Sequence, residues 1–251
     1  MTFERRRALA DEQTPLRTSY LLVEGLCEML LKGLIFDLDG VLVDTVPAHY
    51  EAWRRMFTEY GYEFGPREYR EQVDGLRRLE GARAVMRDAP AETVAQAADL
   101  KNRYYLELIY RGRFNIFESS VRFVRQCEER GCRLAAASSS VNVRYILQKA
   151  GILDAFPVVI GGNDVVDGKP HPEIFLTAAE RLGLSVGECV VFEDAASGVL
   201  AAKRGGFYCV GVVDGSDAGD LALADEIVAN LGEIDFEGLR RRIGRRPAPA
   251  C

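Results

Sequence analysis

Short apolar runs alternate with helical patterns along much of the chain. The runs occupy residues 33–37, 133–137, 158–160, 189–192 and 207–213. Runs of this length and near-continuous apolar character are typical of strands buried on both faces of a parallel sheet. Between them, apolar residues with helical spacing begin at Val143 and at Phe175, and each series is followed by a glycine, Gly151 or Gly183, that can end a helix. The alternation predicts an α/β fold, a doubly wound parallel sheet.

The pattern changes between residues 49 and 113, where helical segments follow one another without a strand pattern between them. An apolar stripe begins at Trp53 and ends at Tyr60, and residues 100–110 are a second helix candidate. We interpret this stretch as a small helical domain inserted after the first strand. It would lie over the C-terminal edge of the sheet, where open α/β proteins bind ligands.

Four parts are expected along the chain. They are an N-terminal extension at 1–31, an α/β core at 32–46 and 115–245, the helical insert at 47–114 and a tail at 246–251. The Arg- and Pro-rich stretch from residue 240 onward is expected to be disordered. Two interpretations of residues 1–28 stay open, a native extension or a misplaced start, with Met29 opening the first strand.

Composition narrows the range of partners. The net charge of -6 and the isoelectric point near 5.2 provide no positive field for a nucleic acid or an anionic membrane, so neither is expected as a partner. The six cysteines show no CxxC pair and are expected to be reduced thiols of a cytoplasmic protein. The apolar segment at 20–31 contains Glu24 and Glu28 and is too short to span a membrane. We expect a monomer that binds a small molecule.

Two acidic clusters follow apolar runs. Asp37 and Asp39 are two positions apart, which is the side-chain period of a strand, so both would face the same crevice, and Gly40 allows a sharp turn. An isolated Asp-x-Asp-Gly is more often only a turn. Glu193 and Asp194 end a second run, where acidic residues alone usually cap a helix. In a parallel sheet the two clusters would converge, and carboxylate oxygens are the ligands that Mg²⁺ requires.

Residues that suit an anion follow two other runs. Ser138, Ser139 and Ser140 offer hydroxyls and backbone N–H groups, although serines are also ordinary helix caps. Lys169 lies in a loop before a proline. A lone loop lysine is usually a solvated charge, but in a crevice with four carboxylates it would neutralise a transferring phosphate.

Taken in order, these residues resemble the four motifs of the haloacid dehalogenase superfamily. They are Asp37-Leu-Asp-Gly-Val-Leu-Val-Asp-Thr45, Ser138, Lys169-Pro170 and Glu193-Asp194, within a match from Lys32 to about Val213. The resemblance implies a Rossmann-like core. It also implies an Mg²⁺ cofactor held by Asp37, Asp194, Glu193 and the backbone carbonyl of Asp39. The dehalogenases of the superfamily lack the second aspartate, so Asp39 argues against that activity.

The resemblance also implies a division of catalytic labour. Asp37 would attack phosphorus to form an aspartyl phosphate. Because an ordinary aspartate is ionised at pH 7, we expect Asp37 to need no activating base. Asp39 would be general acid and then general base. Lys169 would neutralise charge, while Ser138 and the N–H of Ser139 would bind the phosphate.

The helical insert resembles the cap of the β-phosphoglucomutase branch. The resemblance rests on His49 with Trp53, on the run that begins at Gly75 and includes Arg78, and on Lys101-Asn102. It implies that Gly75 and Arg78 bind substrate, with Arg78 holding the phosphate that is not transferred. A histidine on an apolar stripe is more often a packed residue, however, and arginine runs are usually solvated.

Further residues would complete this second phosphate site. The resemblance implies that Ser140 and Asn142 assist from the core side, that Lys101 reaches the site from the cap, and that His49 positions the acid/base aspartate. Val141 departs from the pattern, since the mutases carry a lysine there.

The sequence therefore predicts Mg²⁺-dependent phosphoryl transfer through an aspartyl phosphate on a small phosphorylated sugar. Our first hypothesis is isomerisation of a sugar 1-phosphate of the β-phosphoglucomutase type. The alternatives are a sugar-phosphate phosphatase, which is a hydrolase, and a non-catalytic binding protein on the same fold.

Overall fold

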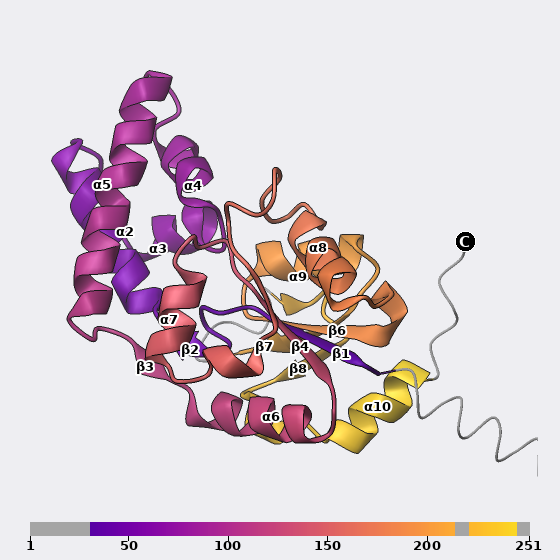
Figure 1. Cartoon of the computed structure of the whole chain (residues 1–251). Coiled ribbons are helices and arrows are strands. Elements are labelled where there is room, and N and C mark those ends of the chain that lie inside the picture. Colours follow the sequence, from indigo (N-terminus) through magenta and orange to yellow (C-terminus); the bar gives the residue numbers. More distant parts are fainter. Residues whose placement is uncertain (1–30, 214–220, 245–251) are drawn as a thin grey trace, which may run out of the picture.

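The computed structural model describes residues 31–213 and 221–244, and its centre is a parallel sheet with the strand order β5-β4-β1-β6-β7-β8 (Figure 1). The strands are β1 (Gly33–Phe36), β4 (Arg133–Ala137), β5 (Val158–Ile160), β6 (Cys189–Glu193), β7 (Tyr208–Val212) and β8 (Glu226–Val228). Five of them are the predicted runs, and β8 is an addition at the edge. The predicted doubly wound α/β fold is confirmed.

Alternating side chains of β1 point into two cores. Leu34 and Phe36 contribute to the core under α6 (Glu118–Glu129), α7 (Val143–Lys149) and α10 (Phe236–Gly244). Ile35 points into the opposite core, which is covered by α8 (Glu173–Leu182) and α9 (Ala196–Arg204). Short 3₁₀ turns lie at Leu153–Ala155, Val186–Glu188 and Leu231–Glu233. Because both faces are covered, the strands need no polar face, which explains their continuous apolar character.

A group of helices follows β1 and rises beyond one end of the sheet (Figure 1). We call this group the cap. It consists of α2 (Val46–Glu59), α3 (Pro66–Glu68), a π-helical turn (Tyr69–Val73), α4 (Arg78–Val85) and α5 (Ala91–Tyr110). The cap has its own buried cluster, which includes Trp53, Met56 and Phe57. At its base, β2 (Val43–Asp44) pairs with β3 (Asn115–Ile116) in an antiparallel ribbon, which ties together the two chain segments that connect the cap to the core.

Several sequence-based boundaries need correction. The helix expected at 100–110 begins at Ala91. Val46, expected to belong to the core, is the first residue of α2, whereas Leu31, expected in the N-terminal extension, is buried in the main core. Residues 240–244 belong to α10 and are not disordered, because Leu239 and Ile243 bury the helix against the sheet. The rest of the predicted extension and the tail at 246–251 lie outside the described residues.

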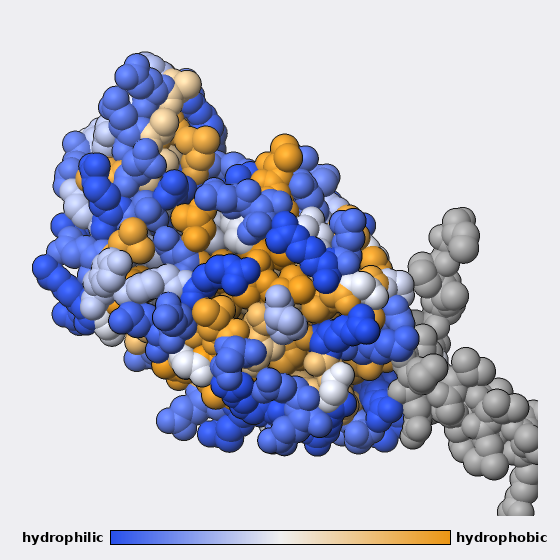
Figure 2. Space-filling view, in the orientation of Figure 1, coloured by the Kyte–Doolittle hydropathy of each residue, from blue (hydrophilic) through white to orange (hydrophobic). Residues whose placement is uncertain are grey.

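The surface in Figure 2 is mainly polar over the cap, and apolar side chains gather in the middle of the same face, over the α/β part. Within residues 31–213 and 221–244, no helix combines the length and apolar character needed to cross a membrane.

Candidate active site

The turn after β1 brings the first and last acidic motifs together. Asp37 continues the strand pairing, since its N–H donates to the carbonyl of Phe192 over 2.9 Å. Gly40 follows with a φ of 79°, a left-handed conformation that favours glycine. A Cβ at Gly40 would lie 1.8 Å from Oδ2 of Asp194. The missing side chain therefore lets the carboxylate of Asp194 lie against the turn that carries Asp37 and Asp39.

Lys169 joins two of the carboxylates in the buried floor of the site. Its Nζ lies 2.5 Å from Oδ1 of Asp37 and also contacts Oε1 of Glu193. Asp37, Lys169 and Glu193 are 5%, 3% and 0% exposed. The other oxygen of Glu193 accepts from the N–H of Ala195 over 2.9 Å. Both oxygens of Glu193 thus have protein partners, and this residue orients Lys169 toward Asp37.

Burial changes the pKa values of the carboxylates in the floor of the site, which consists of Asp37, Lys169, Glu193 and Asp194. Desolvation raises the pKa of Asp37 to about 8, with Lys169 opposing the shift and Glu193 and Asp39 adding to it. Desolvation also raises the pKa of Asp194, again with help from Glu193 and Asp37. Burial alone would lower the pKa of Lys169, but the charges of Asp37 and Glu193 outweigh it and raise that pKa. Burial thus shifts Asp37 toward the protonated form, whereas the adjacent ammonium of Lys169 favours its carboxylate.

This charge pattern fits a divalent cation. When ionised, three carboxylates, those of Asp37, Glu193 and Asp194, interact with one another and with the single ammonium of Lys169. The carboxylates thus exceed the ammonium by two negative charges, and hard oxygen donors of this kind are the ligands of Mg²⁺. Because Glu193 is held by Lys169 and Ala195, the carboxylates of Asp37 and Asp194 are the better placed metal ligands.

Asp39 lies beside this floor and has a set of hydrogen-bond donors of its own. The hydroxyl of Thr45 donates to Oδ1, and the hydroxyl of Ser138 lies 3.5 Å from Oδ2. Desolvation raises the pKa of Asp39, while the hydrogen bond from Thr45 and the charge of Lys101 lower it. Burial thus shifts Asp39 toward the protonated form that a general acid needs.

The cap contributes His49 and Lys101. Their Nδ1 and Nζ atoms are 2.7 Å apart, and Nε2 of His49 lies 3.7 Å from Oδ1 of Asp39. Burial and then the charge of Lys101 hold the pKa of His49 well below its usual value, so the imidazole is neutral. An ammonium only donates, so Nδ1 accepts and the ring proton is on Nε2, toward Asp39.

Lys101 is itself buried between aromatic rings. Its Nζ lies 4.8 Å from the ring centre of Trp53 and 4.9 Å from that of Tyr105. Desolvation lowers its pKa to about 7, with the charge of Asp39 opposing the shift. The two rings offer a cation–π environment that favours the charged form.

Hydrogen bonds connect the cap to the core across the site. The Ser139 hydroxyl donates to the carbonyl of Gly75 over 3.0 Å, and the side-chain amide of Asn142 donates to that of Asn102 over 3.1 Å. The Ser140 hydroxyl accepts from the N–H of Asn142. The cap is therefore in contact with the core in this structure.

Arg78 lines the same cavity, and its guanidinium forms an ion pair with the carboxylate of Asp99, 3.5 Å away. All the residues that sequence reasoning assigned to the site line this one cavity. They are Asp37, Asp39, His49, Gly75, Arg78, Lys101, Ser138, Ser139, Ser140, Asn142, Lys169, Glu193 and Asp194. The structure thus brings together all of the predicted site residues.

Sequence reasoning missed several polar groups of the site, among them Thr45 and Asp74. Thr45 ends the first motif and binds Asp39, a role that its place in that motif could have suggested. Asp74 also lines the cavity, and desolvation raises its pKa to about 6. It directly precedes Gly75, whose position beside the predicted phosphate-binding run was the available signal.

Comparison with known proteins agrees with this geometry. The sequence profile of the family described as haloacid dehalogenase-like hydrolase matches residues 31–206. The chain belongs to this family. It is 33% identical over 214 residues to the β-phosphoglucomutase of Bacillus subtilis (strain 168), with 82% of this chain and 93% of the relative covered.

The names of other relatives include a phosphatase as well as a mutase. The phosphorylated carbohydrates phosphatase of Thermotoga maritima is 33% identical over 222 residues, which cover 81% of this chain and all of the relative (100%). The crystal structure of a β-phosphoglucomutase from Clostridium difficile superposes with a TM-score of 0.78 at 27% identity, over 85% of this chain and 97% of that one. The predicted superfamily and its β-phosphoglucomutase-like branch are confirmed, and the protein is an enzyme of phosphoryl transfer.

Proposed function

We propose that the protein isomerises a sugar 1-phosphate of the β-glucose 1-phosphate type through an aspartyl phosphate on Asp37, with Mg²⁺ as cofactor. The observation that carries this proposal is that one cavity has two walls. One wall carries Asp37 and Lys169, and the other carries the cap cations Arg78 and Lys101. A bisphosphate needs both walls, whereas hydrolysis of a monophosphate needs only the first.

The core wall supplies the groups for phosphoryl transfer. A carboxylate oxygen of Asp37 attacks phosphorus as the bond to the sugar oxygen breaks, and Lys169 neutralises charge on the phosphoryl oxygens. Asp39 gives its proton to the leaving sugar oxygen. Asp37, Asp194 and the carbonyl of Asp39 would hold Mg²⁺, which would offset the negative charge of these carboxylates and favour the ionised form of Asp37.

As a mutase the enzyme starts from phosphorylated Asp37, which a trace of the bisphosphate forms by the steps above. A free hydroxyl of the bound sugar 1-phosphate attacks the phosphorus on Asp37, Asp39 takes the proton of that hydroxyl, and the carboxylate of Asp37 leaves, which forms the bisphosphate. The bisphosphate then turns around, so that Arg78 holds the phosphate that was at Lys169, and Asp37 takes the other phosphate by the first set of steps. The cap must exclude water while Asp37 is phosphorylated, because water at the position of the hydroxyl would hydrolyse the aspartyl phosphate.

Hydrolysis of a sugar phosphate is the second candidate, and two cavity residues favour it. Val141 is neutral, and Asp74 is acidic and faces the same space, so both weaken a second phosphate site. The names of the relatives include both activities, which is why the choice rests on an assay.

That assay follows glucose 6-phosphate and free phosphate together, starting from β-glucose 1-phosphate with Mg²⁺. Isomerisation should exceed phosphate release and should depend on a trace of glucose 1,6-bisphosphate. Arg78→Ala should reduce isomerisation roughly 10- to 100-fold, the range for losing a charge-assisted hydrogen bond, and should affect hydrolysis of a small aryl phosphate much less. Arg87→Ala, at an exposed cap arginine, is the matched control. Phosphate release that dominates with and without the bisphosphate would establish the phosphatase instead.

A further inference from the structure

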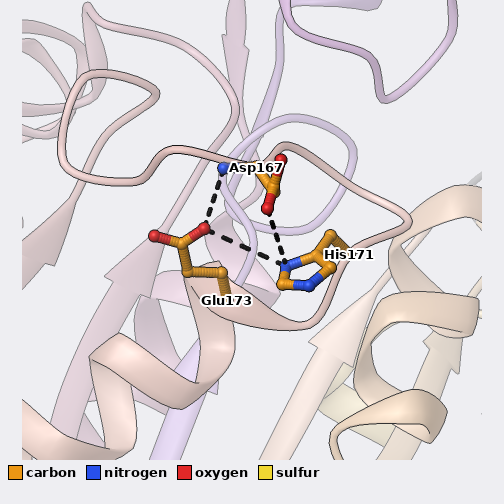
Figure 3. A group of neighbouring side chains, drawn as sticks. All are labelled: Asp167, His171 and Glu173. Atoms are coloured by element: carbon orange, nitrogen blue, oxygen red, sulfur yellow. Dashed lines mark hydrogen bonds and ion pairs between the residues drawn. The ribbon is translucent and has the colours of Figure 1, made fainter.

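A histidine and two carboxylates converge outside the cavity, between β5 and α8. Figure 3 shows the side chains of Asp167 and His171 directed toward one another, with Glu173 reaching them from the start of α8. Nδ1 of His171 lies 4.0 Å from Oδ2 of Asp167 and 3.9 Å from Oε2 of Glu173. One ligand atom from each of the three residues lies within 4.8 Å of the others.

Backbone hydrogen bonds fix the carboxylate of Glu173. Its two oxygens accept from the N–H groups of Val166 and Asp167, over 2.9 and 2.8 Å. These bonds lower the pKa of Glu173, so it is ionised at neutral pH. Glu193 is fully buried and is paired with an ammonium, whereas Glu173 is partly exposed and has only neutral N–H partners, so each of its oxygens keeps a second lone pair that is accessible. The carboxylate is therefore both charged and oriented, while remaining able to bind a further group.

The backbone that carries the imidazole is also constrained. His171 stands between Pro170 and Pro172, and its backbone N–H donates to the carbonyl of Gly168 over 2.9 Å. The two proline rings limit the backbone on both sides of the histidine. A ligand that bridges the exposed imidazole to Glu173 would therefore order the side chain of His171 but not its backbone.

The spacing of these atoms suits a metal ion better than it suits direct contacts. At 3.9 and 4.0 Å, the imidazole is too far from both carboxylates for a hydrogen bond. Bonds of about 2.0–2.2 Å to a tetrahedral zinc ion place ligand atoms about 3.5 Å apart. The two imidazole–carboxylate distances would have to shorten by roughly 0.5 Å, and the two carboxylates, which lie within 4.8 Å of one another, would have to approach by up to roughly 1.3 Å. An imidazole nitrogen with two carboxylates favours Zn²⁺, Co²⁺ or Ni²⁺ over Mg²⁺. We propose that Asp167, His171 and Glu173 form a surface site for a divalent transition-metal ion of the zinc class.

Such an ion would connect the loop that carries Lys169 to α8. Asp167 and His171 flank Lys169 at a distance of two residues each, and Glu173 belongs to α8. In the same loop, the carbonyl of Val166 accepts from Arg77 of the cap over 2.6 Å. An ion that joins the loop to the helix would hold this contact and should raise the melting temperature. The charge of Arg77, which also acts on Glu173, opposes binding.

The test is calorimetric titration of Zn²⁺ into the full chain in an excess of Mg²⁺, which fills the carboxylate floor. We expect binding at one site with a rise in melting temperature. His171→Ala and Asp167→Asn should each weaken it at least ~10-fold, a lower bound taken from the loss of supporting groups around metal sites. Glu180→Gln, an exposed carboxylate on α8, should leave it unchanged.

Substitution of Co²⁺ tests which residues are the ligands. The complex should show the weak visible bands of nitrogen and oxygen ligands, and these should disappear in His171→Ala. Intense near-ultraviolet thiolate bands would place the ion at a cysteine and overturn the proposal. Unchanged affinity in His171→Ala, or no binding of Zn²⁺ at all, would overturn it as well.

Discussion

The two walls of the cavity differ in how firmly they are built. On the core wall, Asp37 and Lys169 are almost fully buried and contact each other directly. On the cap wall, the side chain of Arg78 is 34% exposed and its partner Asp99 is 69% exposed. Ion pairs with such exposure contribute little and rearrange easily. Lys101 of the same wall is buried, so the contrast lies at Arg78. We infer that phosphoryl transfer depends on the firmly held core residues, whereas substrate selection depends on Arg78, whose exposed ion pair can rearrange.

The largest effect is expected when the proposed general acid of the core wall, Asp39, is replaced. Asp39→Asn should reduce turnover of a sugar phosphate about 10²- to 10⁴-fold, because an amide cannot give up the proton that the leaving oxygen needs. With 4-nitrophenyl phosphate, whose leaving group needs no protonation, the burst of nitrophenolate should survive. Rapid-quench kinetics measure both. An equal loss of the burst would mean that Asp39 positions Asp37 and is not the acid.

A second test compares two neighbouring carboxylates of the core wall. Asp194→Asn should weaken Mg²⁺ binding by at least ~10-fold, as removal of a charged ligand does, while Glu193→Gln should weaken it less. The reason is that both oxygens of Glu193 already have protein partners, Lys169 and the N–H of Ala195. Calorimetry on the two variants provides the comparison. Equal losses would show that Glu193 ligates the metal as directly as Asp194 does.

The smallest expected effect concerns pH and the cap wall. Burial lowers the pKa of Lys101 to about 7, so its ammonium is present below that pH and is lost as pH rises through it. With saturating Mg²⁺ to keep Asp37 ionised, kcat/KM, which reports the enzyme free of substrate, should therefore fall severalfold between about pH 6 and 8. His49 adds no step in this range, because its pKa is held well below the usual value. Lys101→Met should have a lower kcat/KM without this step. The same step in the variant would assign it to another group.

The same contrast explains how far the sequence could predict the site. Asp37, Asp39 and Glu193 follow apolar runs at the ends of parallel strands, so the strand period and the sheet determine where they meet. The place of Asp74 before Gly75 pointed to the right region, but its position in the cavity could not be predicted, because it follows a π-helical turn whose Tyr69 and Val73 pack in the cap cluster. The pKa of Asp37 depends on burial by residues far apart in the chain, which no local pattern reports.

Within the fold, two elements were missed for different reasons. β8 has three residues and only Val228 is buried, so its apolar signal is short, and its pairing with β7 is a tertiary contact. In α10 the arginines at 240–242 hide a helical spacing of Phe236, Leu239 and Ile243, which bury one face of the helix. The three arginines thus made α10 resemble a disordered segment, whereas β8 is too short to give an apolar pattern in the sequence.

The most direct test of the account is the site of covalent phosphorylation. The enzyme is mixed with Mg²⁺ and glucose 1,6-bisphosphate, quenched in acid within one turnover, and reduced with borohydride so that mass spectrometry can locate the modified carboxylate. The account predicts a single modified residue, Asp37, and no modification in Asp37→Asn. Modification of Asp39, Glu193, Asp194 or any other carboxylate, or turnover that persists in Asp37→Asn, would contradict it.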